Sequence, residues 1–172
     1  MSSLSSYLIN SIGVWEGLRI YIEPANQPYV INTTTKVSQV NPKDNTVLSF
    51  VENLQASGIN VKSDFAFLFE WNSFRDQKQY SSGSILTIVN DDTNTLYRNK
   101  GYLTNDITIS DASFSSNSQM VLKTNYGGYN FSEEFTFLGA GVRSRHTNQY
   151  TTGGVFKRAG RYLETRLANT PL

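Results

Sequence analysis

The turn signals in the second half of the chain restrict this sequence to an antiparallel β structure. Clusters of small and polar residues interrupt the chain at "SSNS" (115–118), "NYGGY" (125–129), "GAG" (139–141) and "TTGG" (151–154). The segments between them are rich in β-branched and aromatic residues, and their spacing is close to the roughly 8 to 12 residues typical of strand–turn units. A sheet in which each strand pairs with the next, closed or nearly closed, satisfies this pattern.

The same strand pattern extends over most of the chain. We predict extended segments at 15–23, 29–40, 61–71, 83–89, 95–103, 106–114, 118–125, 129–138, 142–150, 153–160 and 161–167. About eight to ten such strands favour an all-β, up-and-down antiparallel barrel that can hold one ligand. Residues 1–172 are expected to form a single domain, because this length suffices for one core but is short for two.

Two short helices interrupt the strands. Residues 4–12 place apolar side chains at helical spacing, and Gly13 ends the pattern. Residues 43–58 place four apolar side chains on one helical stripe, with Asn45 as the expected N-cap and Gly58 as the stop. The sequence therefore predicts a short N-terminal helix and a second short helix.

The composition excludes several classes of function. The formal net charge is +1 and the chain has no basic run, so we expect no nucleic-acid partner. The absence of cysteine excludes disulfides, thiolate metal sites and a cysteine nucleophile. The start, "MSSLSSYLINSIGVW", has neither a basic region nor a long apolar run, which argues against a signal peptide and a membrane span. We therefore expect a soluble, intracellular protein.

His146 is the single histidine, and neither a nucleophile nor a metal-ligand spacing surrounds it. We interpret it as a surface or wall residue and expect no metal site. The turn glycines could cradle a phosphate only before a helix, and none is predicted after them.

The segment 142–150 is polar on both faces. Alternation places Arg143, Arg145 and Thr147 on the same face of a strand. One interpretation is a solvated outer face. The other places the arginines in the barrel or at its mouth, where they would bind the carboxylates of a ligand through paired hydrogen bonds.

Two glutamates precede these arginines by one short turn. Either one could pair with the arginines in the empty protein, or act on a ligand as a proton donor if burial raises its pKa. Glu134 shares its face with Ser132 and Thr136, whereas Glu133 shares its face with aromatic residues. The pattern does not choose between them, and we take Glu134 as the first candidate.

Several motifs, in order along the chain, resemble those of the S-type phycobiliprotein lyases, the CpcS/CpeS chromophore lyases. They are "GVWEGLR" (13–19), "FEW" (69–71), "SGSILTIV" (82–89), "LYRNKGY" (96–102), "SEE" with "VRSR" (132–145), "GG" (153–154) and "ETRL" (164–167). The resemblance implies a ten-stranded lipocalin-like barrel that binds an open-chain tetrapyrrole, phycocyanobilin or phycoerythrobilin. It implies attachment of this bilin by a thioether bond to a cysteine of a phycobiliprotein α or β subunit.

The resemblance also implies the cofactor requirement, the location and the oligomeric partners of the protein. The bilin is the substrate, and no further cofactor is expected. The protein would act in the cyanobacterial cytoplasm or the plastid stroma, as a homodimer or as a heterodimer with a related lyase.

Site residues follow from the same resemblance. Arg143 and Arg145 would bind the two propionates, with Thr147 beside them as the small hydroxyl residue of the family. Glu134 or Glu164 would supply the catalytic acid that the pyrrole nitrogens need.

Aromatic side chains would cover the conjugated surface of the bilin. Phe67, Phe69 and Trp71 share one face of the segment 61–71, although core packing would also account for Trp71. Arg19 matches the early arginine of the family, and its alternative role is a structural ion pair at the barrel mouth.

Two other functions would use the same fold. A lipocalin-like carrier or chaperone would bind a bilin, or another anionic apolar ligand, without transferring it. A structural or assembly protein would keep the barrel without the pocket.

Overall fold

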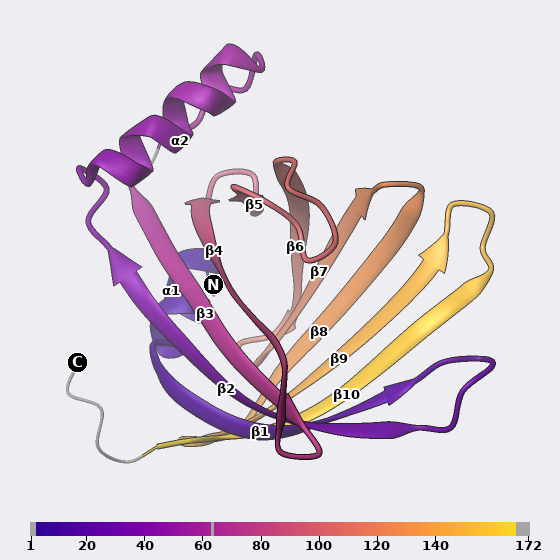
Figure 1. Ribbon diagram of the computed structural model, residues 1–172. Helices are drawn as coiled ribbons and strands as arrows, with labels where there is room; N and C mark the ends of the chain where they lie inside the picture. Colours follow the sequence, from indigo (N-terminus) through magenta and orange to yellow (C-terminus); the bar gives the residue numbers. More distant parts are fainter. Residues whose placement is uncertain (1–2, 63, 168–172) are drawn as a thin grey trace.

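The computed structural model describes residues 3–62 and 64–167, which form two helices and ten strands (Figure 1). The helices are α1 (Leu4–Asn10) and α2 (Asn45–Ala56). The strands are β1 (Gly13–Ile22), β2 (Tyr29–Val40), β3 (Phe65–Arg75), β4 (Lys78–Asn90), β5 (Thr95–Arg98), β6 (Thr108–Ser116), β7 (Gln119–Tyr126), β8 (Tyr129–Gly139), β9 (Val142–Thr151) and β10 (Phe156–Arg166).

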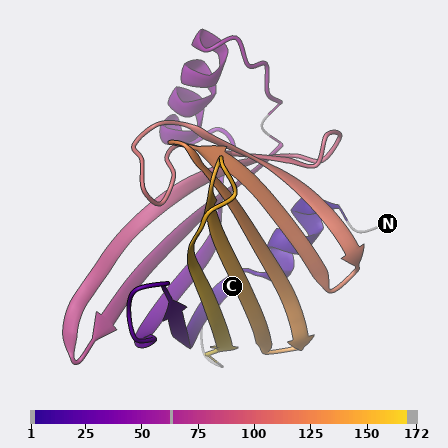
Figure 2. The ribbon, with the colours of Figure 1, turned by 90° about the vertical axis from the view of Figure 1, so that its right-hand side faces the viewer.

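The ten strands form one closed antiparallel barrel. Each strand pairs with its neighbours in the sequence, and β1 closes the ring by pairing with β10, with Leu18 opposite Leu163. Figure 2 views this ring from the side of β8 to β10, and α2 lies outside it in both views. The predicted all-β barrel with two short helices is confirmed.

Three predicted segments differ most from the observed strands. The segments 153–160 and 161–167 belong to a single strand, β10, with an irregular register near Phe156. β5 ends at Arg98 instead of residue 103, because the chain turns out of the sheet at Gly101. The Gly101 N–H donates to the carbonyl of Thr104 at 3.0 Å, and a Cβ at Gly101 would lie 2.9 Å from the Thr104 methyl carbon.

Helix α1 closes one end of the barrel from within. Its buried side chains Leu4, Tyr7 and Leu8 pack against Phe67 and Met120 in the barrel core. Ser3 caps the helix by accepting a hydrogen bond from the Ser6 N–H. The helix is therefore part of the core and forms the floor of the space above it.

Helix α2 covers the outer face of β3, β4 and β5. Its buried residues Val47, Phe50 and Leu54 pack against Ala66 and Ile88, which point outward from the sheet. Covering this face gives the barrel a second small core.

The N-cap of α2 is Asp44, whose carboxylate accepts the Thr46 N–H at 2.9 Å, so the predicted cap at Asn45 was one residue too late. Neither α1 nor α2 is long and apolar enough to cross a membrane.

The end of the barrel opposite α1 carries five connections. Because antiparallel strands alternate in direction, the links that follow β1, β3, β5, β7 and β9 all gather there. The longest are residues 23–28 and 99–107. This end forms the mouth of the barrel.

Candidate ligand-binding cavity

A cavity of about 400 Å³ occupies the barrel between α1 and the mouth. Its floor includes Tyr7 and Leu8, and its rim includes Tyr80, Gln149 and Arg158. The surface is mostly apolar, with several charged side chains that converge on the interior. This combination is typical of a small-molecule site.

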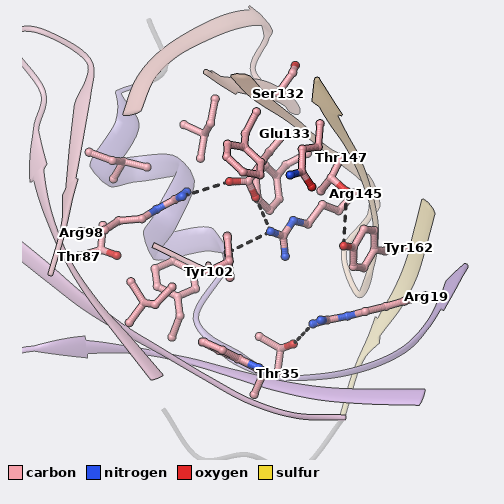
Figure 3. A pocket seen from close by; sticks show the side chains of 18 of the residues that line it. Arg19, Thr35, Thr87, Arg98, Tyr102, Ser132, Glu133, Arg145, Thr147 and Tyr162 are labelled. Atoms are coloured by element: carbon pink, nitrogen blue, oxygen red, sulfur yellow. Dashed lines mark hydrogen bonds and ion pairs between the residues drawn. The ribbon is translucent and has the colours of Figure 1, made fainter. Parts of the chain in front are cut away.

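The centre of the cavity holds an ion cluster of one carboxylate and two guanidinium groups (Figure 3). Glu133 accepts a hydrogen bond from Arg98 Nη1 at 3.1 Å through one oxygen, and from Arg145 Nη2 through the other. Burial alone would raise the pKa of Glu133, but the charges of Arg145 and Arg98 outweigh burial and hold that pKa below its usual range. Glu133 is therefore an ionised carboxylate inside the barrel.

Tyr102 connects this ion cluster to the mouth. Arg145 Nη2 donates to the Tyr102 hydroxyl at 2.9 Å (Figure 3). The Tyr102 ring meets the Trp71 ring edge-on, with the two ring centroids 5.9 Å apart. Trp71 in turn lies over Gly83, where a Cβ would stand 2.6 Å from the indole ring. Glycine at position 83 is thus what allows the indole to line the cavity wall.

A second ion pair lies deeper, next to the floor. Arg143 Nε donates to Glu164 Oε2 at 2.6 Å, and both side chains are buried. The Arg143 guanidinium also lies 4.0 Å from the ring centroid of Trp15, and that of Arg166 lies 4.6 Å from the same ring. Trp15 is fully buried, and its indole makes cation–π contacts with both guanidinium groups.

Two guanidinium groups in the cavity keep an unused donor. Arg19 donates to the Thr35 hydroxyl at 3.2 Å, but its Nε, like that of Arg145, is buried without a partner in the described part of the chain (Figure 3). Both groups lie against the ring of Tyr162, at 5.0 Å for Arg19 and 5.1 Å for Arg145. Because an unpartnered buried donor costs free energy, these two groups are prepared for an acceptor that enters the cavity.

The strand register explains this pairing of arginines. Arg145 lies opposite Tyr162, and Tyr162 lies opposite Arg19, so the three form one row across β9, β10 and β1. Gly160 leaves room for the Tyr162 ring, since a Cβ there would lie 2.6 Å from it.

The charged groups of the cavity and their ion-pair partners leave two positive charges unbalanced. Five arginines line the cavity, and three glutamates pair with four of them. The arginines are Arg19, Arg98, Arg143, Arg145 and Arg158, and the glutamates are Glu23, Glu133 and Glu164. A ligand with two negative charges would neutralise this surplus. Within residues 3–62 and 64–167, no group of three or more His, Asp or Glu side chains is placed to hold a metal ion.

Most of the predicted site residues meet in this cavity. Arg143, Arg145 and Thr147 line it from β9, as the inward-facing interpretation of that strand predicted. Arg19 from β1 lines it as well. The solvated outer-face interpretation of β9 is excluded by this placement.

Two of the three predicted aromatic residues lie at the cavity. Phe69 and Trp71 line the cavity, whereas Phe67 is fully buried in the core packed against α1 and does not line it. Phe67 lies on the same face of β3 but closer to the floor, where α1 fills the barrel.

Neither of the two predicted acids lines the cavity. Glu164 is buried but pairs with Arg143. Glu134 lies outside the cavity, where Gln119 Nε2 donates to it at 2.8 Å and His146 is its cross-strand neighbour. Our preference for Glu134 as the pocket acid was therefore wrong in its placement, and Glu133 takes that position because the face with aromatic residues is the inner one.

Many cavity residues were not predicted as site residues, among them Tyr7, Arg98, Tyr102 and Tyr162. Arg98 shares the inner face of β5 with the core residue Leu96, but a four-residue strand is too short for a pattern to be read.

Comparisons with known proteins agree with the architecture. Residues 3–167 match the profile of the family described as CpeS-like protein, and no curated protein gave a match. The S-type phycobiliprotein lyase CpeS from Guillardia theta has a TM-score of 0.78 at 19% identity, over 98% of this chain and 94% of that chain.

Two further structures share the fold at lower similarity. A DUF3598-family protein of unknown function from Nostoc punctiforme has a TM-score of 0.58 at 11% identity, covering 97% of this chain and 51% of that chain. Rv2717c from M. tuberculosis has a TM-score of 0.52 at 10% identity, over 97% and 99% of the two chains. Because the family profile covers nearly all of the sequence, this protein belongs to the CpeS-like protein family, as its motifs predicted.

Proposed function

We propose that this protein is a phycobiliprotein lyase that binds an open-chain tetrapyrrole in its barrel and attaches it to a cysteine of a phycobiliprotein subunit. Membership of the CpeS-like family supports this function, and so does the fold shared with the lyase from Guillardia theta. The observation that carries the proposal is the surplus of two positive charges inside an aromatic cavity. A bilin has two propionates on a long conjugated surface, and it matches both properties.

The arginines with unused donors would bind the propionates. Arg19 and Arg145 each keep a buried Nε–H without a partner in the described chain, and a carboxylate can accept two N–H bonds from one guanidinium. Such charge-assisted bonds would hold the bilin in one orientation, which is the main contribution that a binding site can make to an addition reaction.

Glu133 would act on the nitrogens of the bilin. Its pKa lies below the usual range, so the group is an anion when the ligand enters. A propionate that binds Arg145 would compete with Glu133 for that arginine and free a carboxylate oxygen. The freed oxygen can accept pyrrole N–H groups and stabilise the protonated form of the tetrapyrrole.

The transfer step would be an addition of the acceptor thiol to the bilin. The S–H group adds across a carbon–carbon double bond: sulfur forms the new C–S bond and the thiol proton ends on the tetrapyrrole. No oxidant or leaving group is required. Because this chain has no cysteine, the bilin cannot be trapped on the lyase itself by a thioether.

Mixing experiments test the proposal. The protein is titrated with phycocyanobilin and with phycoerythrobilin, with and without a phycobiliprotein subunit, and absorption and fluorescence are recorded. We expect a red-shifted band on binding and a coloured subunit that keeps its bilin after denaturation. A subunit with its acceptor cysteine replaced by serine is the control and should remain colourless.

Binding without a covalent product on the intact subunit would favour the carrier function. The absence of any spectral change with either bilin would contradict both the lyase and a bilin carrier.

A further inference from the structure

The floor of the cavity contains a polar group that the proposed function has not used. The hydroxyl of Tyr7 is buried, and it has no hydrogen-bond partner within the described residues. Tyr7 lines the cavity from α1, next to Leu8 and Ser11. A buried donor without a partner is rare in folded proteins, and it indicates an acceptor that a ligand would supply.

The Tyr7 side chain is held in place by its surroundings. Its ring packs at 4.9 Å from the ring of Phe137 and at 6.2 Å from that of Phe114. Helix α1 is fixed in turn by Ser5, whose N–H donates to Asp91 at 2.8 Å. Because the ring and its helix are both packed into the core, the hydroxyl is shielded from bulk water at the floor of the cavity that Tyr7 lines.

The charges around this hydroxyl differ from those higher in the cavity. The cation next to Tyr7 is Arg143, whose charge is balanced by Glu164 at 2.6 Å. Burial raises the pKa of the Tyr7 phenol, and Arg143 offsets only part of this effect. The floor therefore offers a neutral O–H donor in a nearly electroneutral setting, which suits an uncharged carbonyl oxygen better than a carboxylate.

The register separates the two kinds of site by depth. Arg143 and Glu164 form one row with Gly17, and Arg145 and Tyr162 form the next row toward the mouth. Two residues along a strand correspond to about 7 Å. A donor for a carbonyl at the floor and donors for carboxylates one row above it are thus stacked along the barrel axis.

We propose that the Tyr7 hydroxyl donates a hydrogen bond to the lactam carbonyl oxygen of one terminal ring of a bound open-chain tetrapyrrole. The assignment rests on the proposed function, because it takes a bilin as the ligand. The propionates stand on the two central rings of a bilin, which fits carboxylate donors one row above the floor. One terminal ring then lies on the floor, and the opposite terminal ring lies near the mouth, where an acceptor thiol can reach it.

A single substitution, Tyr7→Phe, tests this assignment, since it keeps the packed ring and removes only the hydroxyl. The dissociation constants of phycocyanobilin and of its dimethyl ester are measured by absorption titration for the wild type and the variant. Both ligands carry the lactam carbonyls, but only the free acid carries carboxylates. We expect Tyr7→Phe to weaken both ligands by the same factor, about three- to tenfold, the scale of one neutral hydrogen bond.

A matched control is Tyr97→Phe. Tyr97 is also a buried tyrosine, but it packs under α2 outside the cavity, so both affinities should equal those of the wild type. A second measurement uses the double variant Tyr7→Phe with Arg145→Gln and the free acid alone. If the two side chains hold different groups of the ligand, the factors by which they weaken binding multiply.

Three results would overturn the assignment. Unchanged affinities in Tyr7→Phe would show that the hydroxyl meets no ligand atom. A loss confined to the free acid, or a double variant no weaker than Arg145→Gln alone, would show that Tyr7 meets a propionate. If the wild type bound neither ligand, the proposed function would fail and the floor assignment with it, whereas binding that is indifferent to Tyr7 would leave the proposed function intact.

Discussion

Replacing Glu133 with glutamine should destabilise the barrel and abolish the red-shifted band of a bound bilin. Glu133 accepts hydrogen bonds from both Arg98 and Arg145, and its side chain is 4% exposed. Without it, two neighbouring cations remain unpaired in the barrel, and the surplus of positive charge in the cavity rises. Leaving buried partners unpaired costs about 3–5 kcal/mol.

The lower end of that range applies here. The side chains of Arg98 and Arg145 keep 7% and 12% exposure toward the cavity, which opens at the mouth, so water can solvate them in part. We therefore expect a loss of about 3 kcal/mol in the free energy of unfolding. For a chain of this size, that loss lowers the melting temperature by about 6–12 °C.

Thermal unfolding followed by circular dichroism at neutral pH measures this loss. Glu134→Gln is the matched control, because it makes the same chemical change one residue along, where Gln119 donates the one side-chain hydrogen bond found in the described residues. The control should change the free energy of unfolding by less than about 0.5 kcal/mol and leave the bilin band unchanged. Equal melting temperatures for Glu133→Gln and Glu134→Gln would refute the argument from the ion cluster.

Acid should remove the same stabilisation. The pKa of Glu133 is lower in the folded protein than in the unfolded chain, so its contribution is complete above the ordinary glutamate pKa of about 4.3 and is lost as the pH falls through the lower folded value. The difference in stability between the wild type and Glu133→Gln should therefore be constant near neutral pH and shrink below about pH 4. A difference that persisted unchanged in strong acid would contradict this assignment of charge.

Three other outcomes are expected. Arg19→Gln and Arg145→Gln should each weaken binding of phycocyanobilin by about 1–3 kcal/mol, as measured by titration, and leave binding of its dimethyl ester nearly unaffected. Equal losses for both ligands would mean that the guanidinium groups contact something other than the propionates. Gly83→Ala should displace the Trp71 ring, shift its fluorescence and cost about 1–3 kcal/mol in stability, and an unchanged emission spectrum would show that the indole does not depend on the missing Cβ. Asp44→Ala should lower the melting temperature without changing bilin affinity, because it removes only the cap of α2.

The strand pattern and turn residues predicted the barrel because both are local properties of the sequence. Alternation placed Arg143 and Arg145 on one face, and the structure places that face inside. The same rule could not decide between Glu133 and Glu134. A period of two residues says which side chains share a face, but it does not say which face is inner when both carry polar groups.

The other unpredicted parts of the site depend on contacts between distant segments. The floor at Tyr7 exists because α1 inserts into the end of the barrel, and nothing within residues 4–12 specifies where that helix docks. Tyr162 was recognised only through its pairing with Arg145 and Arg19, which requires the closure of β10 on β1.

Arg145 and Arg19 lie in one row on either side of Tyr162. Their separation limits which ligands can bind both arginines at once. Adjacent strands are about 4.8 Å apart, so two strand spacings place the backbones of these arginines about 10 Å from each other. Their guanidinium carbons lie 5.1 Å and 5.0 Å from the centroid of the shared ring and are at most about as far apart as the backbones. Backbone hydrogen bonds set this interval, and changes in the mouth loops would not alter it. A fatty acid has one carboxylate and can occupy only one end. We therefore expect the barrel to favour a ligand by the distance between its two acidic groups.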